Sequence, residues 1–259
     1  QADGIGAQIV EGGDLVFGIT MSGTSDEDVT VNWSMTLNGS AEAGDLTDPV
    51  VYTGSVVIPA GSTTGSITIP TFDDSLFEGG AGSFEDLTMT LTSASGADLG
   101  STTSVTGLIE DNEGTPVVNL DQADGIGAQI VEGGDLVFGI TMSGASDEDV
   151  TVNWSMTLNG SAEAGDLTDP VVYTGSVVIP AGSTTGSITI PTFDDSLFEG
   201  GAGSFEDLTM TLTSASGADL GSTTSVTGLI EDNEGTPVVN LDQADGIGAQ
   251  IVEGGDLVF

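Results

Sequence analysis

The sequence predicts an all-β protein made of tandem immunoglobulin-like antiparallel β-sandwiches, with about seven strands in each 121-residue repeat. Short runs that alternate apolar and polar residues are separated by clusters of Gly, Asp, Ser and Pro. No convincing helical stretch interrupts these runs. The whole series then returns at a fixed interval along the chain, which is the mark of a repeat architecture.

The repeat is nearly perfect. The segment QADGIGAQIVEGGDLVF occupies Gln1–Phe17, Gln122–Phe138 and Gln243–Phe259, at an interval of 121 residues. The first two copies differ at one position, which is Thr24 in the first and Ala145 in the second. A catalytic protein gains little from identical neighbouring sites, whereas an array gains reach, stiffness and avidity. The repeat therefore favours a structural protein.

Alternating runs predict the strands of the first copy in order. These are Gln8–Glu11, Leu15–Met21, Val29–Leu37, Gly54–Ile58, Gly65–Phe72, Leu87–Ser93 and Thr102–Ile109. After the turn at Asn112–Pro116, a further strand at Val117–Leu120 opens the next unit. Trp33, on the third strand, is expected to fill the core between the two sheets.

This register divides the chain into three parts. Residues 1–114 form a repeat without its opening strand, residues 115–235 form a complete repeat, and residues 236–259 begin a third. One explanation is that the chain is a window on a longer array. The other is strand exchange, in which the end of one subunit completes another. We favour the window, because Gln1–Phe17 duplicates Gln243–Phe259.

Composition restricts the chemistry. The chain has 41 Asp and Glu residues and no Lys, Arg, His or Cys, for a formal net charge of −41. The hydrophobic content argues against disorder, so the fold is expected to recruit external cations against its own repulsion. Without bases or thiols we expect no enzyme, and without cationic side chains no nucleic-acid partner. The sequence contains no apolar span of about 18 residues, so no segment is predicted to insert into a membrane.

The acids gather at predicted strand ends. Three acidic loops, at Glu42–Asp48, Asp73–Glu78 and Glu110–Glu113, can converge on one pole of the sandwich beside the junction to the next unit. Calcium takes six to eight oxygen ligands and suits such a pole better than magnesium. Adjacent carboxylates in the Asp73–Glu78 loop would be costly without a cation. The acids of Asp26–Asp28, by contrast, are expected to be solvated.

These motifs resemble a known family. The order VEGGDLVF, GSAEAGDLTDPVVYTGSVVIPAGSTTGSITIP, FDDSLFEGG, SFEDLTMTL and GLIEDNEG resembles a Calx-beta domain over essentially the whole repeat. The family includes regulatory domains of sodium–calcium exchangers and repeats of large bacterial surface and matrix proteins. In two places the chain departs from the family: Gly44–Pro49 replaces a shorter Asp-Tyr segment, and Glu-Asp-Asn-Glu replaces a terminal run of Asp.

The resemblance implies calcium ligands at matching positions. In the first copy these are Glu11, Asp45 or Asp48, Asp73, Asp74, Glu78, Glu85, and Glu110 or Asp111. In the second copy they are Glu132, Asp166 or Asp169, Asp194, Asp195, Glu199, Glu206, and Glu231 or Asp232. The cofactor implied is Ca²⁺.

We expect a calcium-binding repeat of an extracellular stalk or filament, in a surface adhesin or a biofilm matrix protein. Calcium is expected to stiffen the junctions between repeats. The expected partners are neighbouring copies of the same repeat, including lateral bundling through strand edges. The alternative is a calcium sensor or buffer module that regulates a neighbouring domain. Identical tandem copies favour the stalk.

Overall fold

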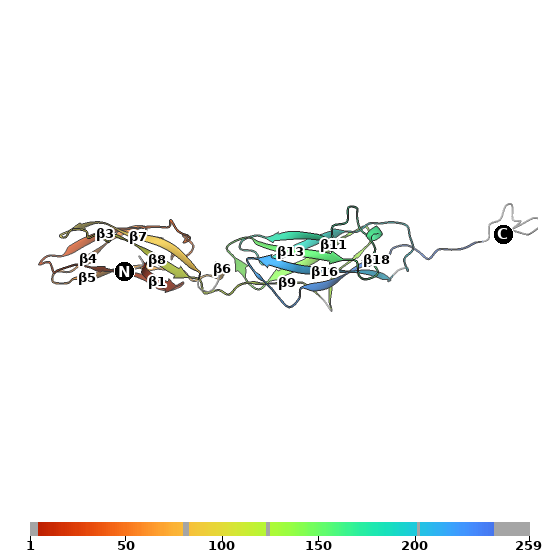
Figure 1. Ribbon diagram of the computed structural model, residues 1–259, viewed down its shortest axis with the longest axis horizontal. Helices are drawn as coiled ribbons and strands as arrows, with labels where there is room; N and C mark the ends of the chain where they lie inside the picture. Colours follow the sequence, from red (N-terminus) through yellow and green to blue (C-terminus); the bar gives the residue numbers. More distant parts are fainter. Residues whose placement is uncertain (1–4, 80–82, 123–124, 201–202, 241–259) are drawn as a thin grey trace, which may run out of the picture.

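The structure, a computed structural model, describes residues 5–79, 83–122, 125–200 and 203–240. Two β-sandwiches follow one another along the long axis of the molecule (Figure 1). The predicted all-β fold class is confirmed, since the described residues contain strands and a single 3-10 turn, η1 (Ala164–Asp166). No helix in these ranges is long and apolar enough to cross a membrane.

The first sandwich contains eight strands. They are β1 (Ile5–Val10), β2 (Asp14–Thr20), β3 (Val29–Thr36), β4 (Thr53–Ile58), β5 (Thr64–Pro70), β6 (Leu76–Phe77), β7 (Phe84–Ser95) and β8 (Ser104–Glu110). One sheet has the order β1-β8-β7-β3-β4, with β1 parallel to β8, and the facing sheet pairs β2 with β5. Every strand predicted for this copy overlaps an observed one. The two-residue strand β6 was not predicted.

The second sandwich repeats this plan and adds an opening strand. Its elements are β9 (Val117–Leu120), β10 (Ile126–Val131), β11 (Asp135–Met142), β12 (Ala145–Ser146), β13 (Val150–Thr157), β14 (Thr174–Ile179), β15 (Thr185–Pro191), β16 (Phe205–Ser216), β17 (Asp219–Leu220) and β18 (Ser225–Glu231). The sheets have the orders β10-β18-β16-β13-β14 and β15-β11-β9-β17. Residues 241–259, most of the predicted third repeat, lie outside the described residues.

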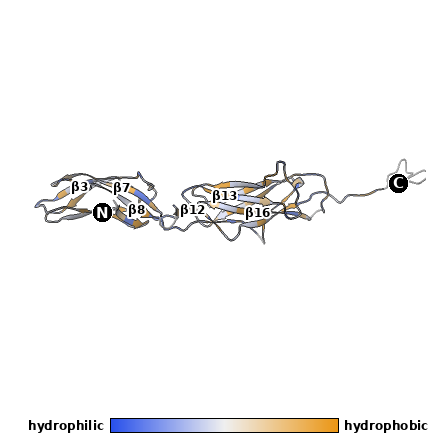
Figure 2. Ribbon diagram, in the orientation of Figure 1, coloured by the Kyte–Doolittle hydropathy of each residue, from blue (hydrophilic) through white to orange (hydrophobic). Residues whose placement is uncertain are grey.

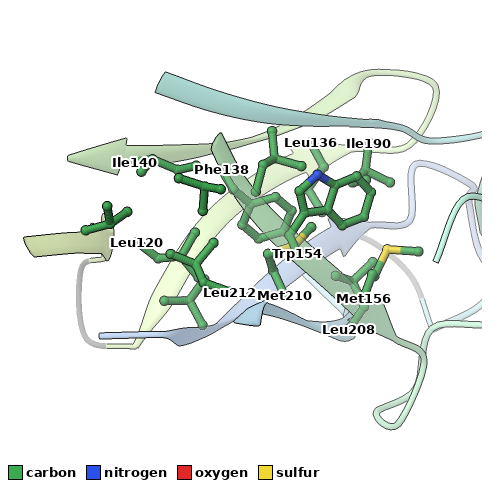
Figure 3. Close-up of a cluster of buried hydrophobic side chains, with 14 of the residues drawn as sticks. Leu120, Leu136, Phe138, Ile140, Trp154, Met156, Ile190, Leu208, Met210 and Leu212 are labelled. Atoms are coloured by element: carbon green, nitrogen blue, oxygen red, sulfur yellow. The ribbon is translucent and has the colours of Figure 1, made fainter. Parts of the chain in front are cut away.

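The core follows from the alternation of the strands. Hydrophobic and hydrophilic residues lie side by side along the strands of both sandwiches (Figure 2). In β13, every second residue from Val150 to Met156 is buried, and Trp154 packs among Phe138 and Met210 between the sheets (Figure 3). Trp33 holds the same place in the first sandwich, 8% exposed, which confirms its predicted core role.

A two-strand ladder joins the sandwiches. Strand β6 of the first repeat runs parallel to β12 of the second, with Leu76 opposite Ala145 and Phe77 opposite Ser146. The Phe77 carbonyl oxygen accepts from Ser146 Oγ at 3.2 Å and from the Asp147 N–H at 3.3 Å. Phe77 itself is buried. The junction therefore contains directional hydrogen bonds in addition to the covalent linker.

Close approach of the two sheets depends on a glycine of β18. A Cβ at Gly228 would lie 2.7 Å from both Leu136 Cδ2 and Phe138 Cζ, atoms of fully buried side chains. We expect Gly228→Ala to lower the free energy of unfolding by about 1–3 kcal/mol, because an extra methyl overpacks the core. Urea unfolding followed by circular dichroism would measure this. The control is Gly144→Ala, whose Cβ meets nothing within 4 Å; an equal loss there would contradict overpacking.

Candidate metal centres

Strand ends bring the acidic loops to one pole of each sandwich. In the first repeat, Glu11 follows β1, and its N–H donates to the Glu110 carbonyl oxygen at 3.1 Å where β8 ends. The Phe72 N–H donates to the Asp45 carbonyl oxygen at 2.8 Å and so fixes the Asp45 loop beside the end of β5. Because β6 lies next along the chain, this pole faces the second repeat.

Two carboxylate clusters form at this pole. The turn cluster consists of Glu11, Asp73 and Glu113, and the loop cluster consists of Asp45, Glu78 and Glu85. In each cluster, one carboxylate oxygen from each residue lies within 4.8 Å of the others. The second repeat has the same two clusters, Glu132 with Asp194 and Glu234, and Asp166 with Glu199 and Glu206.

Hydrogen bonds hold the turn cluster in place. Asn112 donates its backbone N–H to Glu11 Oε1 and its side-chain Nδ2–H to Asp73 Oδ1, both at 3.0 Å. Gly12 has a φ of +75°, and a Cβ there would lie 2.8 Å from Asp73 Cβ. Only glycine therefore allows the turn after β1 to approach Asp73 so closely.

Asp111 links the two clusters. Its Oδ1 accepts from the Glu113 N–H at 2.9 Å, and its Oδ2 accepts from the Glu78 N–H at 3.1 Å. Asp111 is 4% exposed. One buried carboxylate thus positions a residue of each cluster.

Burial and neighbouring negative charges disfavour ionisation of the glutamates in the loop cluster. Burial raises the pKa of Glu85 to about 9, and the neighbouring Asp45 carboxylate adds to the effect. Burial also raises the pKa of Glu78 to about 8, with further contributions from the charges of Asp45 and Asp74. Asp45 is 7% exposed. At neutral pH, this cluster holds protons unless a cation replaces them.

The turn cluster behaves in the same way. Burial, then contact with Glu11 and Asp111, raises the pKa of Glu113 to about 8. In the second repeat, contact with Glu132 raises the pKa of Glu234 to about 7, with burial as the next cause. Shared protons are the alternative to a bound cation in each case.

The donor set fits a hard cation. The second carboxylate oxygens of Glu85, Glu113, Glu206 and Glu234 are buried and accept no hydrogen bond. Two ligands on opposite sides of a calcium ion lie about 4.8 Å apart at the usual bond length of about 2.4 Å. The oxygens of each cluster lie within this distance of one another, which is close enough for them to share one ion. Each cluster also consists of oxygen donors alone and contains a buried oxygen that needs a partner. The residues present therefore fit calcium.

The structure gathers most of the predicted ligands and separates others. The clusters contain Glu11, Asp45, Asp73, Glu78 and Glu85, with Glu132, Asp166, Asp194, Glu199 and Glu206 in the second repeat. Asp111 and Asp232 lie behind the clusters as positioning residues. Outside the clusters lie Asp48, Asp74, Glu110, Asp169, Asp195 and Glu231. The metal-binding role of each residue stays a prediction.

The structure distinguishes the two aspartates that the sequence left open, and it shows a local role for Asp74. Asp45 is buried in the loop cluster, whereas Asp48 is exposed. Asp74 Oδ1 accepts from the Leu76 N–H at 2.7 Å, so this carboxylate shapes the loop that leads into β6.

Sequence reasoning missed two contributors. Glu113 belongs to the turn cluster, and its only signal was its place in the acidic GLIEDNEG stretch. Asp147 is the counterpart of Asp26, which was expected to be solvated. Its charge nevertheless adds to those that raise the pKa of Glu78 and Glu85 in the preceding repeat. No pattern within a single repeat reveals a contribution from the next one.

The comparisons agree with the architecture. The Calx-beta domain family matches residues 12–113 and residues 132–234. Comparison with curated protein sequences gives no match, and no catalytic domain is identified.

Solved structures that match the chain include the apo form of the Calx CBD1 domain, at 21% identity, a TM-score of 0.38, and coverage of 46% of this chain and 98% of that one. The calcium binding domain CBD12 of CALX1.1 is 15% identical, with a TM-score of 0.36 and coverage of 86% and 96%. A two-domain protein of unknown function from Bacteroides fragilis is 10% identical, with a TM-score of 0.29 and coverage of 72% and 78%. Because the family matches most of the chain, one domain in each sandwich, the chain belongs to the Calx-beta family.

Proposed function

We propose that this chain is a calcium-binding structural array, part of an extracellular stalk or filament, in which calcium stiffens the junction between repeats. The observation that carries the proposal is that the loop cluster and the junction share one segment. Glu78, a member of the loop cluster, directly follows β6, whose Phe77 accepts two hydrogen bonds from the second repeat.

Calcium would act first on charge. The chain has no cationic side chain to oppose its 41 carboxylates, so the clusters share protons or take up external cations. Calcium held by Asp45, Glu78 and Glu85 would replace the shared protons and give the buried Glu85 oxygen a partner. At a hundredfold excess over Kd, one site stabilises the folded state by about 2.7 kcal/mol.

The same ion would then act on the junction. Ordering Glu78 also orders the adjacent strand β6, which is paired with β12. Asp147 of the second repeat adds its negative charge to the same pole. An ion there attracts carboxylates from both repeats, whereas without it they repel one another. Calcium should therefore convert a hinged pair of sandwiches into a rod.

The extracellular assignment is supported by composition. Without Lys or Arg, the chain offers no cleavage site to trypsin-like proteases, a property suited to a surface adhesin or biofilm matrix protein. Extracellular calcium-binding modules typically have sites of modest affinity, which the calcium concentration outside the cell is high enough to fill.

The first test is the pH dependence of stability. Glu78 and Glu85 have folded-state pKa values of about 8 and 9, against 4.5 as the ordinary value. The contribution of these two groups to the free energy of unfolding is complete below about pH 4.5 and is lost as the pH rises through about 8 to 9. Between these pH values the folded state binds more protons than the unfolded state, so stability falls as the pH rises. In chelator, the urea midpoint should therefore be higher at about pH 5 than at about pH 8.

Calcium should reverse this order, because it binds the deprotonated carboxylates and competes with protons. The measurement is urea unfolding at both pH values, in excess calcium and in excess chelator. Equal stability of the metal-free protein at both pH values would contradict the raised pKa values of Glu78 and Glu85.

A second test compares Asp45 with Asp48. The double variant Asp45→Asn and Asp166→Asn keeps oxygen acceptors but removes a buried charge from each loop cluster. We expect it to lose at least tenfold in calcium affinity, measured by isothermal titration calorimetry, and to gain stability in chelator because repulsion falls. The matched control is Asp48→Asn with Asp169→Asn, at exposed positions. An affinity loss in the control alone would assign the ligand to the other aspartate.

A third test addresses the junction. We expect calcium to increase the maximum dimension of the chain in small-angle X-ray scattering, and Asp147→Asn to reduce this extension. Asp26→Asn removes the corresponding charge from the first repeat and serves as the control. A maximum dimension that calcium does not change would contradict the stalk proposal. It would favour the alternative, a sensor or buffer module in which calcium alters the affinity for a neighbouring domain.

A further inference from the structure

One flank of each sandwich carries no charged side chain. Residues 50–72 of the first repeat and residues 171–193 of the second contain no Asp or Glu, although the chain has 41 acids in 259 residues. In the first repeat this stretch includes β4 and β5, which are edge strands of the two facing sheets and contact one another (Figure 1). We call this side the neutral flank. In the second repeat it is formed by β14 and β15.

Carboxylates stand at the ends of the neutral flank and not along it. At the turn after β4, the Ala60 N–H donates to Asp28 Oδ1 at 2.9 Å, so this carboxylate already has a partner in its own sandwich. Asp48 precedes the flank at its other end. The next longest stretch without an acid, residues 29–41, contains β3, which pairs with β4. The uncharged surface therefore continues from the edge onto the sheet.

Strand β4 presents open backbone groups on this flank. It pairs with β3 on one side only, as β14 pairs with β13. The Met35 N–H donates to the Tyr52 carbonyl oxygen at 2.7 Å. Because hydrogen-bonded pairs alternate in an antiparallel ladder, every second residue after Tyr52 directs its backbone groups toward β3. Thr53, Ser55 and Val57 direct theirs the other way, where no strand lies among the described residues.

This edge lacks the features that protect the others. Of the four edge strands that the structure describes in the main sheets of the second sandwich, β10 has a register shift between Ile126 and Ala128. Strand β15 ends at Pro191, which has no N–H to donate, and β17 is two residues long and begins at Asp219. Bulges, prolines, charges and short edges are the usual protection against added strands. Strand β14 has an unbroken register and contains neither a proline nor a charge.

Apolar side chains accompany the open backbone groups. Val57 is 50% exposed, and Val178, its counterpart in β14, is 49% exposed. Val51 and Tyr52, just before β4, are also exposed. Val51 borders a pocket of about 160 Å³ whose lining includes Trp33 and contains no carboxylate. Covering such a surface is favourable.

We propose that the neutral flank is a self-association surface and that its partner is the neutral flank of a second copy of this chain, joined edge to edge through β4 or β14. A second copy fits this surface because of charge. Two chains of formal charge −41 repel one another wherever their acidic poles approach. Contact is least opposed where both surfaces are uncharged.

The edge is complementary to itself in one antiparallel register. When Ser55 lies opposite Ser55 of a second copy, Thr53 lies opposite Val57, and all three residues bring outward backbone groups together. Each of these opposed pairs then exchanges two hydrogen bonds. A twofold axis relates the two chains, and two five-stranded sheets become one continuous sheet.

This surface belongs to the repeat and not to the ends of the chain. The same open edge occurs in both sandwiches, and β3 and β5 lie on either side of β4 in the sequence, as β13 and β15 do for β14. An array presents one flank in each repeat, so weak contacts add up once two rods lie side by side. The contact uses no cluster carboxylate and does not rest on the proposed calcium sites. In a stalk, it would join arrays into bundles.

The first test is the mass of the chain in solution, measured by sedimentation velocity in excess chelator so that calcium takes no part. We expect species larger than 25.8 kDa, whose share rises with protein concentration. The share should also rise with ionic strength from about 0.15 M to about 1 M, because the screening length falls from about 8 Å to about 3 Å. A chain that stays monomeric across this range would overturn the proposal.

A matched pair of variants locates the contact. Val57→Asp with Val178→Asp places a charge on each open edge and should give monomer at every concentration. The control, Val16→Asp with Val137→Asp, adds the same charges at valines of the facing sheets that are 48% exposed, and should associate as the parent does. Circular dichroism checks that both variants fold. Association that persists in the edge variant, or an equal loss in the control, would contradict the assignment to this flank.

A cysteine variant tests the register, since the parent chain contains no Cys. Ser55→Cys with Ser176→Cys places thiols opposite one another across the contact. The Cα atoms of a hydrogen-bonded antiparallel pair are about 5.5 Å apart, within the range that a disulfide spans. We expect mild oxidation to link these chains covalently several times faster than the control Val16→Cys with Val137→Cys. Equal rates would indicate random collision and would refute edge pairing.

Discussion

Repulsion between carboxylates is the constraint on which the rest of this structure depends. No side chain carries a positive charge, so no ion pair can offset the acids that the fold brings together. The clusters respond by holding protons well above the usual pH range of glutamate. A proton and a divalent cation are competing solutions to the same electrostatic problem. Calcium dependence would thus follow from composition as much as from the geometry of one site.

The clusters lie in the same segment as the junction between the sandwiches, so their charge can affect how the two sandwiches are joined. The Asp73–Glu78 loop begins with a residue of the turn cluster, continues through β6, and ends with a residue of the loop cluster. Its middle is hydrogen-bonded to the next sandwich. In the proposed mechanism, a change in the charge of the clusters therefore reaches the junction through one to three residues of backbone. A long relay across the core is unnecessary.

The sequence predicted the sandwich well because period-two alternation is a direct imprint of a half-buried strand. It also predicted most cluster residues, since acids next to strand ends must meet at a pole. It could not separate Asp45 from Asp48, because that choice depends on how the Gly44–Pro49 loop folds back on Phe72. The sequence did not predict the role of Asp147 or the two-residue ladder, for another reason. Both are contacts between repeats, and no periodicity within one repeat encodes them.

The ladder between Leu76–Phe77 and Ala145–Ser146 also has a geometric consequence. It sets the register in which one sandwich meets the next, and in the proposed calcium-bound rod it would help to set the rotation between them. When the repeats are copies, every such step is the same, and equal steps compound into a regular superhelix whose pitch and handedness are set by a single junction. Position 145, where the two copies differ, lies in this ladder. In the proposed filament, one residue of this kind would therefore change the coiling of the whole assembly while each sandwich stays as it is.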